Sequence, residues 1–295
     1  MPPVELWRRA VVGRVAQVEE VRSRLAVRES AASALIDRSP PAVAAALADH
    51  ARAALASGAP SLPTAVLEQA VVAGPAGACI VVACPALTDD RVRAFSSAEL
   101  FERAVPATPG VGARTARALE MIAALEGLDF VTHVFGLLVL TADCHADRIV
   151  HASHADLVGT IFSNAIEDDV RFGEMLVHET AHSTLTLAAR SVGERFESTE
   201  RFWSPWRGRP RPLALHLQGV YAFSMVARYL QRVLDARLAP AGRRRIVARK
   251  LTEVGGHLAE AAPHAQAALR LVDADLREMV AGALAGACAS GRSAG

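Results

Sequence analysis

Apolar residues recur at three- and four-residue intervals through much of the first 125 residues, which are rich in Ala, Val, Leu and Arg. The spacing is clearest in residues 4–27 and 42–56, and it is typical of amphipathic helices. Clusters of Pro and Gly interrupt the pattern and predict several helices of about ten to twenty residues each. Residues 80–83 fit a short strand and a buried helical turn equally well, because periodicity does not separate the two.

The pattern changes between residues 129 and 164, where FVTHVFGLLVL and LVGTIFSNA carry β-branched and aromatic residues between Gly, Asp and Asn. These short runs predict two or three strands. The segment that follows, GEMLVHETAHSTLTLAAR at residues 173–190, has no Pro and no internal Gly. Its apolar positions predict a mostly buried helix.

The remaining chain alternates between an extended connection and helices. The Trp- and Pro-rich residues from 200 onward predict an extended aromatic segment, because Pro removes a backbone donor and fixes its own φ angle. A helix resumes at Leu213 and continues past Ala227. Residues 245–285 then predict two further helices, with breaks at Gly255-Gly256 and at Pro263.

These elements predict a mainly α fold with a small β-sheet (α+β). The N-terminal half is helical, short strands precede the central helix, and the C-terminus is helical. We divide the chain into a helical N-terminal region, residues 1–125, and a second region, residues 126–295, that carries the histidine motif described below; the two could also form one continuous domain. With 295 residues, 52% of them hydrophobic, the chain can bury a full core.

Charge and composition exclude several classes of partner. The formal net charge is +1, so the chain lacks the excess of basic residues that binds nucleic acid or an anionic membrane. It has no run of about eighteen uninterrupted apolar residues, and MPPVELWRRAVVGRV lacks the features of a signal peptide. The spacing of the four cysteines is irregular and is typical of reduced thiols rather than of a disulfide framework; they are Cys79, Cys84, Cys144 and Cys288. We therefore expect a cytoplasmic protein; the sequence indicates no oligomeric state.

Residues 178–182 read HETAH. On a helix, this spacing places His178 and His182 one turn apart on the same face, where both imidazoles can bind one metal ion, with Glu179 beside them. Imidazole suits iron and zinc alike, so the motif does not select the metal. The alternative is a pair of core histidines satisfied by hydrogen bonds. Three other histidines lie upstream, at spacings that fit no common face of a strand or helix, and we interpret them as loop residues: His145, His151 and His154.

The segment ERFWSPWRGRPRPLALHLQGVYAF, residues 200–223, places Arg207, Arg209 and Arg211 within five residues of one another. Planar guanidinium groups bind carboxylates with paired hydrogen bonds, so this loop could hold a carboxylate ligand. The alternative is that the arginines are solvated while Trp203 and Trp206 cover the core.

Four stretches taken together, LVGTIF, FGEMLVHETAHSTL, ERFWSPWRGRPRPL and QGVYAF, resemble the HExxH-type α-ketoglutarate-dependent peptide β-hydroxylase family, which modifies ribosomally synthesised peptides. The resemblance covers roughly residues 150 to 230. It implies an Fe(II) enzyme that uses α-ketoglutarate and O₂ to hydroxylate the β-carbon of a peptide side chain. The peptide partner would be a precursor with a leader segment or a carrier-bound chain.

The resemblance also implies roles for individual residues. His178 and His182 would bind the metal, and Arg207 or Arg211 would bind the far carboxylate of α-ketoglutarate. Glu179 would orient the ligands or the substrate, and the substrate pocket would include two further residues, Gln218 and Tyr221.

The third metal ligand is open, because the family places a histidine at the position of Gln218 or of Phe223 and this chain has none at either. His216 is the nearest substitute, and Glu200 is an alternative that matches the downstream glutamate ligand of zinc proteases. Two other functions remain in view. One is a Zn(II) metallopeptidase with Glu179 as general base. The other is a non-catalytic peptide-binding protein with an incomplete metal site.

Overall fold

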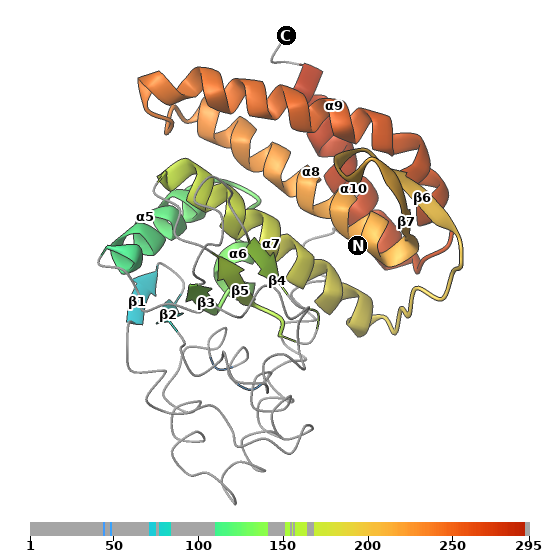
Figure 1. Cartoon of the computed structure of the whole chain (residues 1–295), viewed down its shortest axis with the longest axis horizontal. Coiled ribbons are helices and arrows are strands. Elements are labelled where there is room, and N and C mark those ends of the chain that lie inside the picture. The colour runs from blue at the N-terminus through green and yellow to red at the C-terminus, as the bar shows by residue number, and fades with distance from the viewer. Residues whose placement is uncertain are drawn as a thin grey trace, which may run out of the picture.

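A mixed five-stranded sheet forms one layer of the protein (Figure 1). The computed structural model describes residues 44, 48, 71–74, 77–83, 110–140, 151–153, 155, 157–163 and 168–292. The strand order is β1-β2-β3-β5-β4, in which β2, β3 and β5 run parallel and the edge strands β1 and β4 pair antiparallel with their neighbours. The strands span Val71–Gly74 (β1), Gly77–Ala83 (β2), Leu137–Leu140 (β3), His151–Ser153 (β4) and Thr160–Ser163 (β5).

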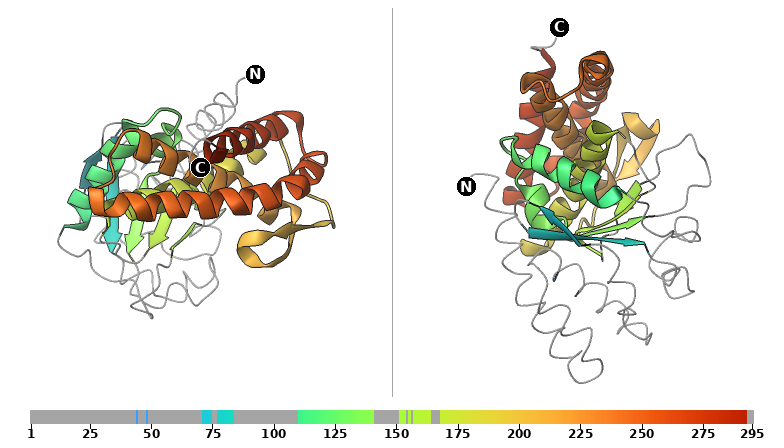
Figure 2. Two further views of the ribbon diagram at one scale, coloured as in Figure 1. Left: turned by 90° about the horizontal axis from the view of Figure 1, so that it is seen from above. Right: turned by 90° about the vertical axis from the view of Figure 1, so that its left-hand side faces the viewer.

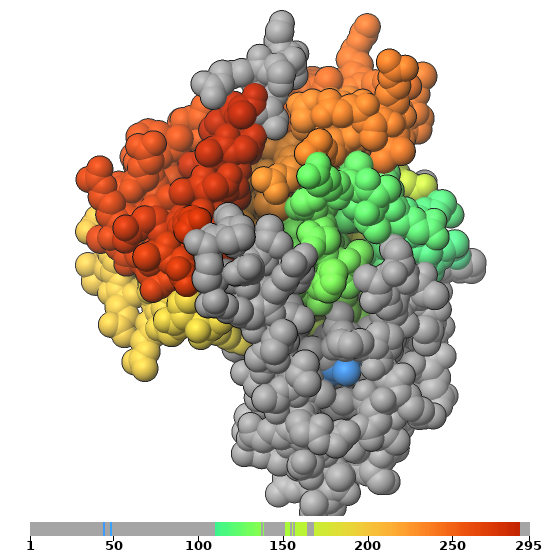
Figure 3. All heavy atoms as spheres, turned by 180° about the vertical axis from the view of Figure 1, so that it is seen from behind, coloured from blue at the N-terminus to red at the C-terminus, as the bar shows by residue number. Residues whose placement is uncertain are grey.

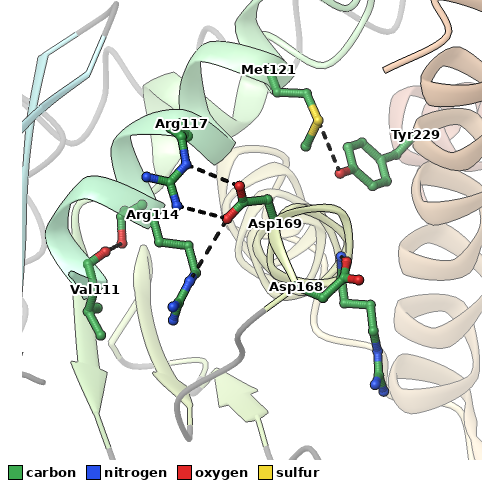
Figure 4. A network of polar contacts seen from close by, with 9 residues as sticks. Val111, Arg114, Arg117, Met121, Asp168, Asp169 and Tyr229 are labelled. Carbon is green, nitrogen blue, oxygen red and sulfur yellow. Dashed lines mark hydrogen bonds and ion pairs between the residues drawn. The ribbon is translucent and has the colours of Figure 1, made fainter. Parts of the chain in front are cut away.

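Three helices cover one face of this sheet (Figure 2). They are α5 (Val111–Ala123), α6 (Phe130–Val134) and α7 (Asp169–Ser191). The N-cap of α7 is Asp168, whose carboxylate accepts a hydrogen bond from the backbone N–H of Arg171 at 2.9 Å, and this cap satisfies one of the free donors at the helix start. Arg117 donates two hydrogen bonds to Asp169 and so ties α5 to the first turn of α7 (Figure 4).

Three long helices make up the C-terminal part: α8 (Leu213–Asp235), α9 (Arg244–Leu269) and α10 (Ala274–Arg292). The α8 helix contacts α7 on one side and both α9 and α10 on the other. Seen from behind, the C-terminal helices form the upper part of the surface, with the α5–α6 segment below them (Figure 3). A hairpin of β6 (Arg201–Ser204) and β7 (Arg209–Pro212), joined by the short helix η4 (Pro205–Arg207), packs against α8 and α9.

The contact between α7 and α8 depends on a glycine. Tyr229 on α8 is fully buried, and its hydroxyl donates to the carbonyl of Val170 at 2.9 Å. A Cβ atom at Gly173 would lie 2.3 Å from this hydroxyl, so only glycine permits the approach. The same hydroxyl lies 3.9 Å from the sulfur of Met121 on α5 (Figure 4). One tyrosine therefore joins three helices of the core.

The predicted fold class is confirmed: the protein is mainly helical with a small β-sheet. The helix over residues 173–190 lies within α7, and the helix from Leu213 is α8. Residues 80–83 belong to strand β2. In residues 1–109, for which the pattern predicts helices, Ala44 and Ala48 are helical, whereas residues 71–74 and 77–83 form strands β1 and β2. The rest of that prediction, including residues 4–27, lies outside the described residues.

Two predictions of local structure are wrong. FVTHV at the start of the expected strand region forms helix α6, because Phe130, Val131 and Val134 bury one helical face. Likewise α9 passes through Gly255-Gly256 and Pro263 without a break. Its buried positions, Leu251, Val254, Leu258, Ala261 and Ala265, form a continuous stripe at helical spacing. Pro263 is exposed, so water can satisfy the carbonyl that loses its N–H partner.

Among the described helices, none combines the length and the apolar character that crossing a lipid bilayer requires.

Candidate metal centre

His178 and His182 lie one turn apart on α7, as the HETAH spacing predicts, and their Nε2 atoms are 3.1 Å apart. The rings are perpendicular, with centroids separated by 4.7 Å. Two imidazole nitrogens that bind one ion at about 2.1 Å and at right angles lie about 3.0 Å apart. The observed separation therefore fits a shared metal ion.

The protonation of this pair also suits a metal. Burial, with a smaller contribution from the nearby His182, lowers the pKa of His178 to about 3. Burial likewise lowers the pKa of His182. Neutral imidazole is the form that binds metal ions. Within the described residues, the buried Nδ1 of His182 has no hydrogen-bond partner, so the ring's polar contact is on the Nε2 side.

Glu179 faces strand β4 and is almost completely buried, with 3% of its surface exposed. Its Oε1 accepts a hydrogen bond from Nδ1 of His151 at 2.5 Å, and its Oε2 accepts one from the hydroxyl of Ser153 at 2.6 Å. Burial by itself would raise the pKa of Glu179, but the hydrogen bond from His151 and the charges of His178, His182 and His151 together outweigh burial and hold the pKa below its ordinary value. Glu179 is therefore an ionised carboxylate whose two oxygens are both engaged.

The position of His151 corrects its interpretation as a loop residue. It is the first residue of β4, and its ligand atom lies within 4.8 Å of those of His178 and Glu179, an arrangement that could hold a metal ion. The ring centroids of His151 and His178 are 5.3 Å apart. His151 and Ser153 are two residues apart on a strand and so share a face, which is the only sequence signal for the pair. His145 and His154 lie outside the described residues.

The structure does not bring either predicted third ligand to the histidine pair. His216 is fully buried on α8, where its ring lies 5.5 Å from that of Phe202 in β6. Glu200 is exposed, and its backbone N–H donates to the hydroxyl of Ser198. Neither residue lines the cavity described next. On the helix, His216 and Phe223 are two turns apart, about 10 Å along the axis, and it is Phe223 that contacts His178.

A cavity of about 1370 Å³ opens beside the histidine pair. It brings together residues of α7, α8, β4 and the β6–β7 hairpin. Among the residues that line it are His151, His178, His182, Arg207, Arg211 and Gln218. Gln218 also donates to the hydroxyl of Thr186 on α7 at 3.4 Å. Tyr221 is buried outside this lining, and burial raises its pKa.

Arg207 and Arg211 differ in their surroundings. The positive charge of Arg207 contributes to lowering the pKa of both His178 and His182, so its guanidinium lies within electrostatic range of the pair. Burial lowers the pKa of Arg211, and the charges of neighbouring arginines lower it further. Arg209, between them, is exposed and does not line the cavity. The loop thus directs two of its three arginines to the cavity.

An aromatic wall closes the cavity beside His178. The ring of Phe223 lies 5.0 Å from that of His178 and 4.9 Å from that of Trp206. Trp206 in turn lies against Gly219. Gln218 and Phe223 of α8 both contact the motif helix α7, Gln218 through Thr186 and Phe223 through His178, and they present an amide and a phenyl ring.

The sequence matches no family model, and no curated protein matches it.

Proposed function

We propose that the protein is an iron(II)- and α-ketoglutarate-dependent hydroxylase that acts on the β-carbon of a side chain in a ribosomally synthesised peptide, with O₂ as cosubstrate. The observation that carries the proposal is the location of the His178–His182 pair and of Arg207 in one cavity. Iron bound there would supply the activation of O₂ against a C–H bond. The chain's own residues bind, orient and shield the reactants.

Each of these residues has a distinct role in the proposal. His178 and His182 hold the metal through neutral imidazole nitrogens. Arg207 binds the far carboxylate of α-ketoglutarate, because a guanidinium grips a carboxylate with two charge-assisted hydrogen bonds. Arg211 adds positive charge on the same side of the cavity. Phe223 and Trp206 keep water from the side of His178 that they cover.

The size of the cavity is consistent with a peptide substrate. Its volume of about 1370 Å³ exceeds that of pockets that hold one small molecule, which measure about 300–1,000 Å³. Leu215 and Ile246 line it and are each 43% exposed. Exposed apolar side chains at a cavity mouth favour contact with a second chain. The cavity therefore has room for a keto acid and a peptide side chain together.

The zinc metallopeptidase reading has less support, because it needs Glu179 to take a proton from water. Both oxygens of Glu179 already accept hydrogen bonds from strand β4, and its pKa is held low. A general base works best with a pKa near the working pH and within reach of the proton it removes. Glu179 meets neither condition.

Anaerobic loading with Fe(II) and α-ketoglutarate, followed by exposure to O₂, tests the proposal. We expect a visible absorption band when the keto acid binds and succinate after O₂ is added, with a gain of 16 mass units on a peptide from the same gene neighbourhood. His178→Ala should abolish all three signals, whereas His133→Asn, a change on an exposed residue of α6, should retain them. Peptide cleavage by the zinc-loaded protein without succinate formation would support the peptidase instead. Failure to retain any transition metal would support a non-catalytic peptide-binding protein.

A further inference from the structure

His151 enters the site from a different element than the motif histidines. It lies at the start of the edge strand β4, and it is hydrogen-bonded to Glu179, the residue next to His178 on α7. The inference that follows rests on the metal site of the proposed function. It concerns which residue completes that site, since two imidazoles alone hold a catalytic metal weakly and catalytic sites normally have three protein ligands.

The hydrogen bonds of Glu179 fix the tautomer of His151. An ionised carboxylate only accepts hydrogen bonds, so Nδ1 of His151 must carry the proton that it donates to Oε1. In the neutral ring, the form that binds a metal ion, Nε2 then has a free lone pair. A carboxylate that accepts from one ring nitrogen while the other binds the metal is the usual arrangement around metal-bound histidines. The hydroxyl of Ser153 occupies Oε2 at 2.6 Å and holds the carboxylate in place.

The position of His151 is also suitable. Its ring contacts that of His178 edge-on, with an interplanar angle of 70°. It lines the same cavity as both motif histidines, and its ligand atom lies within 4.8 Å of that of His178. The side chain is 28% exposed, so it has room to adjust when a metal binds.

Other candidates in the described part of the chain fit less well. Glu174, one turn before His178, forms an ion pair with Lys250 at 3.8 Å. His216, near the start of α8, packs against Phe202 of β6. Glu200 is exposed. Glu179 lies 3.9 Å from Nε2 of His178, but its lone pairs already serve β4.

We propose that His151 is the third protein ligand of the metal held by His178 and His182, and that Glu179 is a positioning residue that directs it. The glutamate of the HETAH motif thus acts through a histidine 28 residues upstream rather than on water. The third ligand thus comes from the strand before the motif helix and not from the helix after it.

His151→Asn separates the two functions of this side chain. The Asn amide can still donate to Glu179 in place of Nδ1–H, but it has no counterpart to Nε2. We expect the Kd for Co(II), measured by calorimetry on the full chain, to rise by about 100-fold or more, since even outer-shell changes cost about 10- to 100-fold. The Tm of the metal-free protein should stay close to that of the wild type. His133→Asn is the matched control and should leave both values unchanged.

A Kd for His151→Asn within about threefold of the wild type, which is below about 0.7 kcal/mol, would overturn the inference. So would a large loss of Co(II) affinity in His216→Leu. If His151→Asn does not fold, X-ray absorption on the Co(II)-loaded wild type decides the matter: three imidazole ligands support His151, and two overturn it.

The outcomes also separate this inference from the proposed function. Co(II) binding that is unaffected by His151→Asn overturns the inference alone, because succinate formation is measured independently. Binding that depends on His151 without any succinate overturns the hydroxylase and leaves the ligand set intact. A wild-type protein without affinity for Co(II) or Fe(II) overturns both.

Discussion

The indole ring of Trp206 lies so close to Gly219 that a Cβ atom on this glycine would come 2.6 Å from the indole Nε1. Trp206 belongs to η4 in the hairpin connection, and Gly219 is buried in α8. The indole packs on Phe223, and Phe223 packs on His178. The missing side chain at residue 219 therefore sets the position of the aromatic wall beside the candidate metal centre.

Gly219→Ala should destabilise the protein by about 1–3 kcal/mol, the usual cost of overpacking a well-packed site. Gly256→Ala is the matched control, because Gly256 is helical and a Cβ there would have open space. It should stabilise the protein by about 0.5–1 kcal/mol through the better helix propensity of Ala. Urea unfolding of both variants measures the difference. Equal effects of the two changes would contradict the close contact.

The pH dependence of stability should carry a contribution from His216. Burial, with a smaller contribution from the charge of His264, lowers its pKa from an ordinary value of 6.5 to about 4. The main chain of Trp203 lies near the ring and acts in the opposite direction, raising this pKa. Its contact with the ring does not have hydrogen-bond geometry, so neither ring nitrogen of His216 has a hydrogen-bond partner among the described residues. The folded state thus keeps His216 neutral while the unfolded chain takes up a proton below pH 6.5.

Stability should therefore fall as the pH decreases from about 6.5 to about 4, because the unfolded state binds more protons in this window. His216 contributes up to about 1.4 kcal/mol per pH unit. His216→Leu should reduce the slope of the unfolding free energy against pH by that amount between about pH 4 and 6.5. Above pH 7 the slope should be the same as in the wild type. Urea titrations at several pH values test this, with His133→Asn as the control. An unaltered slope in His216→Leu would show that the residue is not buried in its neutral form.

Local patterns predict the elements that depend on a single stretch of chain. The α7 helix and the facing of His178 and His182 follow from spacing alone, and so does the helix from Leu213. The contact of His151 with Glu179 does not, because it depends on the antiparallel pairing of β4 with β5, which brings the strand to the side of α7. No periodicity within residues 145–154 encodes that pairing.

The same limit explains the errors in α6 and α9. In both helices, burial of one face outweighs the local preference of the residues. The β-branched residues of FVTHV favour a strand, and the Gly and Pro residues of α9 disfavour a helix, but tertiary packing of the buried positions decides the conformation. For α9 the glycines and Pro263 interrupt no buried position of the stripe, so the helix continues to Leu269.

Arg207→Ala should weaken α-ketoglutarate binding if this guanidinium holds its far carboxylate. Loss of a charged hydrogen-bonding partner costs about 1.5–3 kcal/mol, which corresponds to an increase of about 10- to 150-fold in Kd. Arg209→Ala is the control: Arg209 carries the same charge and lies two residues from Arg207, but its side chain does not line the cavity. This change should alter the Kd by less than about threefold. Titration of the anaerobic Fe(II) protein with α-ketoglutarate, monitored by visible absorption, measures the Kd of both variants. Equal losses in the two variants would indicate a general effect of charge rather than a specific clamp.

Glu179→Gln distinguishes a positioning role from a general base. The Gln carbonyl can still accept from Nδ1 of His151, while its amide loses the contact in which Oε2 accepts from Ser153. We expect iron affinity to fall by about 10- to 100-fold, with succinate formation recovering to within about tenfold of the wild type at saturating Fe(II). If Glu179 instead removes a proton in the reaction, turnover should fall by about 10²- to 10⁴-fold and added metal should not restore it. Measuring the initial rate against Fe(II) concentration in both proteins distinguishes the two roles. Only the positioning role shifts the half-saturating Fe(II) concentration upward while preserving most of the maximal rate.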